Sequence, residues 1–250
     1  MSQVIVEICI ESVDDARAAA GADRLELCQA LAVGGLTPSS GLQKDVRDAI
    51  SIPLMTMIRP RPGGFCYGGT EFGVMQRDIE LAINLGTDGI VFGCLTHSGE
   101  VDVRRTAEIV RQVRAAARPL DIVFHRAFDF VPDPLTGLDQ LIELGVTRVL
   151  TSGQKPTALE GAALIGELVV RSSGRIQLLA GSGVRPENAV ELVRRSCCDQ
   201  IHAALRKPVI DESIATRGIP LSRLGTGNSD STYSATDPDL VRSLLAAIRR

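Results

Sequence analysis

Two short segments near the start of the chain repeat one pattern, a carboxylate followed two residues later by a thiol. They are Val6-Glu7-Ile8-Cys9 and Leu25-Glu26-Leu27-Cys28. Successive residues of a strand point to opposite faces, so each glutamate shares a face with the cysteine that follows it. If the two segments are neighbouring strands in matching register, both thiols and both carboxylates face each other across about 4.8 Å. The pattern therefore predicts a small cluster of thiols and carboxylates on one face of a sheet.

This cluster suits two kinds of chemistry. Cys9 and Cys28 are candidate ligands for Cu(I), which prefers soft sulfur donors, and Met57 would add a thioether. Glu7 and Glu26 are candidate acid–base residues of an enzyme. A buried carboxylate needs a specific partner to stay ionised, so each glutamate must lie beside another functional group. The structural alternatives stay open: cysteine is a common small buried hydrophobe, and buried glutamates often belong to ion-pair networks.

Further charged groups stand where two later apolar runs end. Arg59 follows one run, and His125 and Arg126 follow another that continues to Asp129. His125 is a candidate general acid or base, while Arg59 and Arg126 are candidates to hold anionic groups. The same three residues are also the candidate partners of the two glutamates in a purely structural network.

A glycine-containing turn, Gly181-Ser182-Gly183, comes shortly before a helix that we expect to begin near Pro186. Backbone N–H groups in such a turn can face an anion, and barrels commonly bind phosphate at the loops after their last two strands. Gly181, Ser182 and Gly183 are therefore candidate anion-binding residues, with Arg206 as the accompanying cation. A tight turn without a ligand is the alternative, and His202 nearby is either part of this site or a core histidine.

The elements that must position these residues alternate regularly between short apolar runs and longer helical stretches. Three of the helices are predicted to stop at glycines, Gly21, Gly86 and Gly145, each shortly before the next strand. Eight such units favour a closed (β/α)8 barrel over an open doubly wound sheet, because no glycine-rich dinucleotide turn follows the first strand. The predicted strands are Val4–Ile10, Arg24–Cys28, Pro53–Pro60, Gly89–Leu95, Asp121–Phe128, Arg148–Ser152, Arg175–Ala180 and Gln200–Leu205.

One barrel domain covers residues 1–250, and a long polar segment interrupts its alternation of strands and helices. Residues 206–237 are rich in Ser, Thr, Gly and Asp and are predicted to form a long loop or lid, followed by a closing helix, Pro238–Arg250. In such a barrel the functional residues lie at the C-terminal ends of the strands. We therefore expect one site that collects the residues named above.

Composition narrows the class of protein. A formal net charge of −3 and the lack of a basic stripe argue against nucleic acid as a partner. The sequence predicts neither a signal peptide nor an apolar run of the roughly 18 residues that a membrane span needs. Six cysteines without a secretory signal indicate free thiols in a reducing cytosol. We expect a cytoplasmic protein that does not bind membranes.

Eight ordered motifs resemble those of the CutC copper homeostasis family, over most of the chain from Glu7 to about Pro208. The resemblance implies a (β/α)8 barrel, a cytoplasmic location, frequent homo-oligomers and Cu(I) binding by Cys9 and Cys28. The chain departs from the family pattern at Ser182, where a glycine is usual. The motifs are Glu7-Ile8-Cys9, Gly21-Ala22-Asp23-Arg24-Leu25-Glu26-Leu27-Cys28, Gly34-Gly35-Leu36-Thr37-Pro38-Ser39, Met57-Ile58-Arg59-Pro60-Arg61, Asp88-Gly89-Ile90-Val91-Phe92-Gly93, Phe124-His125-Arg126-Ala127-Phe128-Asp129, Leu150-Thr151-Ser152-Gly153-Gln154 and Gly183-Val184-Arg185-Pro186-Glu187-Asn188.

Two functions follow from these observations. One is a copper protein that binds Cu(I) through Cys9 and Cys28. The other is a barrel enzyme that acts on a small anionic or phosphorylated metabolite, using Glu7, Glu26, Arg59, His125 and Arg126.

Overall fold

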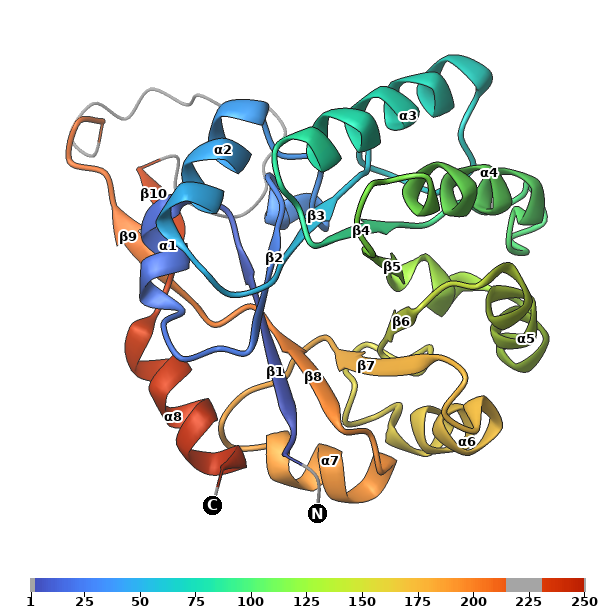
Figure 1. Ribbon diagram of the computed structural model, residues 1–250. Helices are drawn as coiled ribbons and strands as arrows, with labels where there is room; N and C mark the ends of the chain where they lie inside the picture. The colour runs from blue at the N-terminus through green and yellow to red at the C-terminus, as the bar shows by residue number, and fades with distance from the viewer. Residues whose placement is uncertain (1–2, 215–230, 250) are drawn as a thin grey trace.

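A closed barrel of eight parallel strands forms the centre of the molecule (Figure 1). The computed structural model describes residues 3–214 and 231–249. The order around the barrel follows the chain, and the predicted (β/α)8 fold is confirmed. The strands are β1 (Ile5–Ile10), β2 (Arg24–Leu27), β3 (Leu54–Met57), β4 (Gly89–Phe92), β5 (Asp121–Phe124), β6 (Arg148–Thr151), β7 (Gln177–Gly181) and β8 (Gln200–Ala203).

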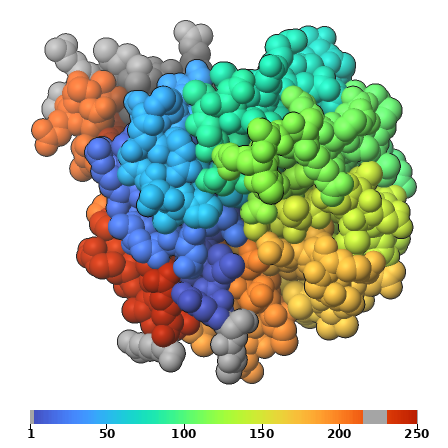
Figure 2. All heavy atoms as spheres, in the orientation of Figure 1, coloured from blue at the N-terminus to red at the C-terminus, as the bar shows by residue number. Residues whose placement is uncertain are grey.

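Helices surround the barrel in Figure 1, and Figure 2 shows the atoms of the same view packed closely together. The Ser12 hydroxyl accepts the backbone N–H of Asp15 and begins the first helix, while Gly86 and Gly145 end later ones with φ of +86° and +80°. These glycine stops confirm the predicted ends. The helices are α1 (Val13–Ala18), α2 (Ser40–Ala49), α3 (Gly69–Asn84), α4 (Val103–Arg114), α5 (Pro134–Leu144), α6 (Ala162–Ser172), α7 (Ala189–Ser196) and α8 (Pro238–Ile248), with 3-10 helices at Leu31–Val33 and Arg126–Phe130. No helix among the described residues is long and apolar enough to cross a membrane.

The first two strands are neighbours, but they do not pair in the matching register considered for them. Cys9 lies opposite Glu26, and Glu7 lies opposite Arg24, so the repeated motifs are offset by two residues. Closing a sheet into a barrel tilts its strands and staggers their pairing. An offset of two residues keeps every side chain on its own face, so the predicted cluster survives with different neighbours.

The fifth strand is shorter than the sequence predicts. It ends at Phe124 rather than Phe128, and residues 126–130 form a 3-10 helix. The physical reason is a side-chain cap, because Nδ1 of His125 accepts the backbone N–H of Ala127 and turns the chain.

The segment 206–237 begins and ends as strands rather than as loop. β9 (Arg206–Ile210) and β10 (Thr232–Thr236) pair as an antiparallel ribbon that leads into α8. Residues 215–230 lie outside the described part of the chain, so the predicted lid stays a prediction.

Candidate functional site

A polar layer fills the barrel interior near the N-terminal ends of the strands. Glu7 pairs with the guanidinium of Arg24, which also donates to Gln200 at 3.0 Å. Arg148 donates to the same Gln200 oxygen at 3.1 Å and pairs with Asp121 at 2.8 Å. Burial opposes the ionisation of Glu7, but Arg24 and His202 outweigh it and hold the pKa of this carboxyl well below its usual range. Glu7 thus belongs to a buried ion-pair network, but its partners are Arg24 and His202 rather than the predicted Arg59, His125 or Arg126.

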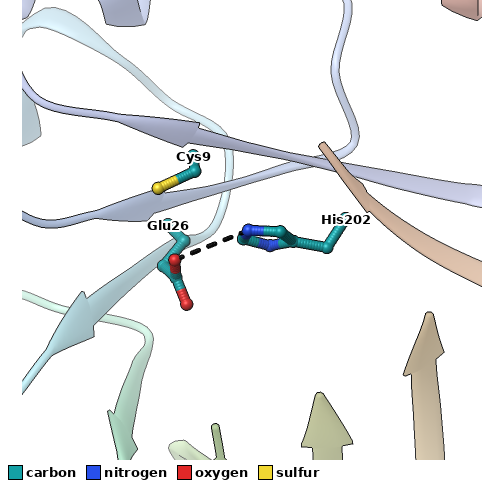
Figure 3. A group of neighbouring side chains, drawn as sticks. All are labelled: Cys9, Glu26 and His202. Atoms are coloured by element: carbon teal, nitrogen blue, oxygen red, sulfur yellow. Dashed lines mark ion pairs between the residues drawn. The ribbon is translucent and has the colours of Figure 1, made fainter. Parts of the chain in front are cut away.

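His202 of β8 lies between two glutamates, Glu7 and Glu26. Its Nδ1 lies 2.7 Å from Glu7 Oε1, and its Nε2 lies 3.8 Å from Glu26 Oε2. Figure 3 shows the imidazole directed from β8 toward the Glu26 carboxylate on β2. A carboxylate only accepts hydrogen bonds, so Glu7 fixes a proton on Nδ1 and leaves Nε2 facing Glu26.

The pKa values of Glu26 and His202 move in the same direction. Burial raises the pKa of Glu26, and His202 only partly offsets this. Burial alone would lower the pKa of His202, but Glu26 and Glu7 together raise it. Glu26 and His202 are therefore suited to share one proton, and either side chain can donate it.

The two motif thiols meet as expected from the sequence, although in a different register. Cys9 Sγ and Cys28 Sγ are 3.5 Å apart, and both side chains are fully buried. They belong to an apolar interior cluster that includes Met55 and Met57. The hydrogen bond with Cys28, together with burial and nearby Glu26, holds the pKa of Cys9 well above that of a free thiol.

Above this cluster a cavity of about 330 Å³ opens at the C-terminal ends of the strands, and we call it the mouth cavity. The thiols of Cys9 and Cys28 are not among the groups that line it. It adjoins a second cavity of about 600 Å³, and the two share Arg59, Phe65 and Arg126 in their walls. The charged and titratable residues that line the mouth cavity are Glu26, Arg59, His125, Arg126, Arg185 and His202.

Arg59 is a buried cation without a carboxylate partner among the described residues. Its guanidinium donates only to carbonyl oxygens, those of Val33 and Gly35 at 2.9 Å and that of Gly63 at 2.8 Å. Its Nε is buried and has no partner. Its Cζ also lies 5.2 Å from the centroid of the Phe65 ring. A buried charge that is balanced by carbonyl dipoles and an aromatic face, without a carboxylate, favours an anion beside it.

His125 presents an unused N–H group. Because Nδ1 accepts the Ala127 N–H at 3.1 Å, the ring proton of the neutral form is on Nε2. This Nε2 is buried and has no partner within the described chain. Burial, and then the positive charges of Arg59 and Arg126, lower the pKa of His125 to about 3, so the ring is neutral at physiological pH.

The loop after β7 also lines the mouth cavity. Ser182, Gly183 and Arg185 line the mouth cavity, and the N–H groups of Gly183 and Val184 donate to no acceptor in the described residues. Ser182 has a φ of +90° and Gly183 one of +67°, a backbone shape that favours glycine. Ser182 therefore adopts a backbone conformation in which a serine is strained.

Not every residue predicted for the site reaches it. Glu26, Arg59, His125, Arg126, Ser182 and Gly183 line the mouth cavity. Glu7 lies below it in the polar layer, and Gly181 packs against His202. Arg206 lies elsewhere, since its guanidinium binds Glu11 and Asp15 at 2.7 Å each.

Two residues of the site were missed or undervalued by sequence reasoning. Arg185 stands in the expected anion loop and makes no side-chain hydrogen bond or ion pair with the described residues. His202 belongs beside the glutamates because the closed barrel pairs β8 with β1. A closed barrel must pair its last strand with its first, and this rule would have predicted that His202 lies beside the glutamates.

The thiol pair does not fit a linear Cu(I) centre as it stands. A zinc–sulfur bond is about 2.3 Å long, and a linear unit with bonds of that length needs sulfurs roughly 4.6 Å apart. The observed 3.5 Å is too short for this arrangement. A second set lies nearby: Cys9, Glu26 and His202 each offer one ligand atom, and these atoms lie within 4.8 Å of one another.

The fold and this site define a (β/α)8 barrel protein with a charged, buried site at the C-terminal mouth. Residues 4–207 match the model of the CutC family, and the chain belongs to that family. It is 47% identical over 203 residues to a CutC family protein of Histophilus somni, with 80% of this chain and 82% of the relative covered. It is 41% identical to the human copper homeostasis protein cutC homolog, covering 97% and 88%. A CutC crystal structure from Streptococcus agalactiae superimposes with a TM-score of 0.75 at 34% identity, covering 80% of this chain and 97% of that one.

Proposed function

We propose that this protein is an enzyme that binds a small anionic metabolite in the mouth cavity and transfers a proton to or from it. One observation carries the proposal. Three residues that line this one cavity, Glu26, Arg59 and His125, each hold a buried polar atom without a partner in the described chain. An unsatisfied buried polar atom costs about 1–3 kcal/mol, which a ligand with complementary groups would recover.

The cavity favours an anion for reasons of charge. Arg59 and Arg185 have no carboxylate partners among the described residues, while Arg126 pairs with Asp129 at 2.8 Å. The free N–H groups of Gly183 and Val184 add donors beside them. Such a set of donors and cations suits a phosphate or a carboxylate group.

Proton transfer falls to Glu26 and His202 at the floor of the cavity. Glu7 holds His202 in one orientation, as the third member of many acid–base arrangements does. The Glu26 carboxylate has one oxygen toward His202 and the other, Oε1, without a partner. We place the acid–base work on Glu26, with His202 as its proton partner.

Ligand binding tests this proposal directly. We expect inorganic phosphate and a panel of sugar phosphates and small carboxylates to include compounds that raise the melting temperature of the full chain. Arg59→Gln and Arg185→Gln should weaken binding of those compounds at least tenfold by calorimetry, whereas Arg111→Gln, on the outer face of α4, should not. If no compound stabilises the parent, or all three variants bind alike, the proposal fails.

A metal site is the second candidate function, and the cluster of Cys9, Glu26 and His202 favours it. The human relative carries the name copper homeostasis protein cutC homolog. Anaerobic titration with Cu(I) against a competing chelator would test binding by the parent and by the Cys9→Ser, Cys28→Ser double variant. The Cys66→Ser, Cys197→Ser double variant removes the same number of thiols elsewhere. Equal binding by both double variants would exclude the site.

We extend the proposal to the setting of the protein. Free buried thiols suit the reducing cytosol. The homo-oligomer that the family resemblance implies stays a prediction. A net charge of −3 and the small cavity suit a small anionic metabolite as partner rather than nucleic acid or a membrane.

A further inference from the structure

His125 differs from the other groups of the mouth cavity because it offers a hydrogen bond without a charge. Its Nδ1 accepts a hydrogen bond from the backbone N–H of Ala127, so the neutral ring can donate only from Nε2. The imidazole is also held in place. Its ring centroid lies 5.0 Å from that of Phe65, and a Cβ at Gly93 would clash with its Cε1. The donor is therefore rigid and preorganised.

A neutral donor among cations has a specific use. A resting anion is better held by the arginines, which are already present. A rigid N–H suits an oxygen that is uncharged in the substrate and gains charge during the reaction. A neutral imidazole of depressed pKa serves this purpose, because it polarises a carbonyl without giving up a full proton.

The carboxylate needed to complete such a reaction lines the same cavity. Glu26 belongs to β2 and His125 follows β5, so two strands separate them around the closed barrel. Each has an atom without a partner: an acceptor, Oε1, on Glu26 and a donor, Nε2, on His125. A ligand that reached both atoms would offer a proton to one and an oxygen to the other.

Building on the function proposed above, we infer that the substrate is a small anionic α-hydroxycarbonyl compound, and that the protein catalyses its isomerisation through an enediolate. Glu26 takes the proton from the carbon next to the carbonyl. The electrons of that C–H bond form a carbon–carbon double bond, and the negative charge moves to the carbonyl oxygen. His125 Nε2–H and the Arg59 guanidinium hold this oxygen.

The second half of the reaction returns the proton. Glu26 delivers it to the former carbonyl carbon, while the neighbouring hydroxyl loses its proton and becomes the new carbonyl. The hydroxyl proton passes to the charged oxygen. Atoms and electrons balance within the substrate, so the step consumes no oxidant, reductant, water or cofactor.

Hydrogen exchange tests the inference on the full chain. The protein is incubated in D2O with dihydroxyacetone phosphate, ribulose 5-phosphate and fructose 6-phosphate, and loss of the carbon-bound proton is followed by NMR. We expect exchange for at least one of them, abolished by Glu26→Gln. No exchange with any of the three overturns the inference.

Two variants of His125 separate donation from structure. His125→Gln keeps an N–H near the position of Nε2, whereas His125→Asn keeps an acceptor near Nδ1 and loses the donor. Loss of one such donor lowers rates by about 10²–10³-fold. We expect that loss for His125→Asn and less than tenfold for His125→Gln. Equal rates for the two variants, with unchanged melting temperatures, overturn the role of His125.

An enediolate analogue gives a readout besides turnover. Phosphoglycolohydroxamate should bind the parent at least tenfold more tightly than it binds His125→Asn, while inorganic phosphate should bind both alike. Phosphate binding without exchange or hydroxamate discrimination overturns this inference and leaves the proposed function standing. Absence of all binding overturns both.

Discussion

Glu7→Gln removes one negative charge from the polar layer inside the barrel while keeping the shape of the side chain. Glu7 is 1% exposed and Arg24 is 5% exposed, so neither charge can turn to water. The variant leaves the Arg24 guanidinium with the neutral amide of Gln200 and a neutral amide in place of the carboxylate. The His202 Nδ1 proton also loses its charged acceptor.

The magnitude follows from this burial. Removing one partner of a buried ion pair costs about 3–5 kcal/mol, because the other charge remains without compensation. For a chain of about this size each kcal/mol lowers the melting temperature by about 2–4 °C. We therefore expect Glu7→Gln to melt roughly 6–20 °C below the parent.

The assay is urea unfolding at pH 7, with thermal melting as a second measurement. The matched control is Glu108→Gln, which breaks an exposed ion pair with Arg104 on α4 and should cost no more than about 0.5 kcal/mol. The pKa of Glu7 is lowered in the folded state, so its contribution is complete above the unfolded value of 4.5 and is lost as the pH falls below it. The variant should lack this part of the acid dependence. A loss as small as that of the control would refute the reasoning.

Three further predictions concern the cavity and the thiols. Only Cys66 and Cys197 should react rapidly with Ellman's reagent in the folded protein, because the other four thiols are buried; rapid reaction of four or more would contradict the described packing. Because the pKa of His125 is lowered from 6.5 to about 3, the unfolded chain binds a proton first, and stability should fall as the pH drops from 6.5 toward 3. The free energy of unfolding should change by at most about 1.4 kcal/mol per pH unit in this range. The urea midpoints of His125→Asn should lack this pH dependence, and an unchanged pH dependence would argue against a buried neutral ring. Gly93→Ala should cost about 1–3 kcal/mol in unfolding free energy by crowding the His125 ring, and a crystal structure with an unmoved ring would disprove this.

The alternation of apolar runs with helices determines the barrel, and it is readable in the sequence because each element carries local signals. Helix stops such as Gly86 and Gly145 depend on the backbone freedom of glycine alone. The polar residues at the strand ends could likewise be assigned to one mouth, because all strands of the barrel run in the same direction. Arg59, His125 and Arg126 were found in this way.

The partners of those residues depended on the tertiary structure. The stagger between β1 and β2 set Cys9 opposite Glu26, and the closure of β8 onto β1 brought His202 between Glu7 and Glu26. Both follow from the shear of a closed barrel, a property of all eight strands together, which no local pattern encodes.

The sequence by itself determined a (β/α)8 barrel of the CutC family with thiols, carboxylates and arginines near its mouth. Only the tertiary structure decided that the thiols are buried 3.5 Å apart beneath the cavity, and that three residues lining it, Glu26, Arg59 and His125, each have a buried atom without a partner. The reason is physical. Which polar atoms remain without a hydrogen-bond partner depends on every neighbour in space, and those neighbours come from segments far apart in the chain.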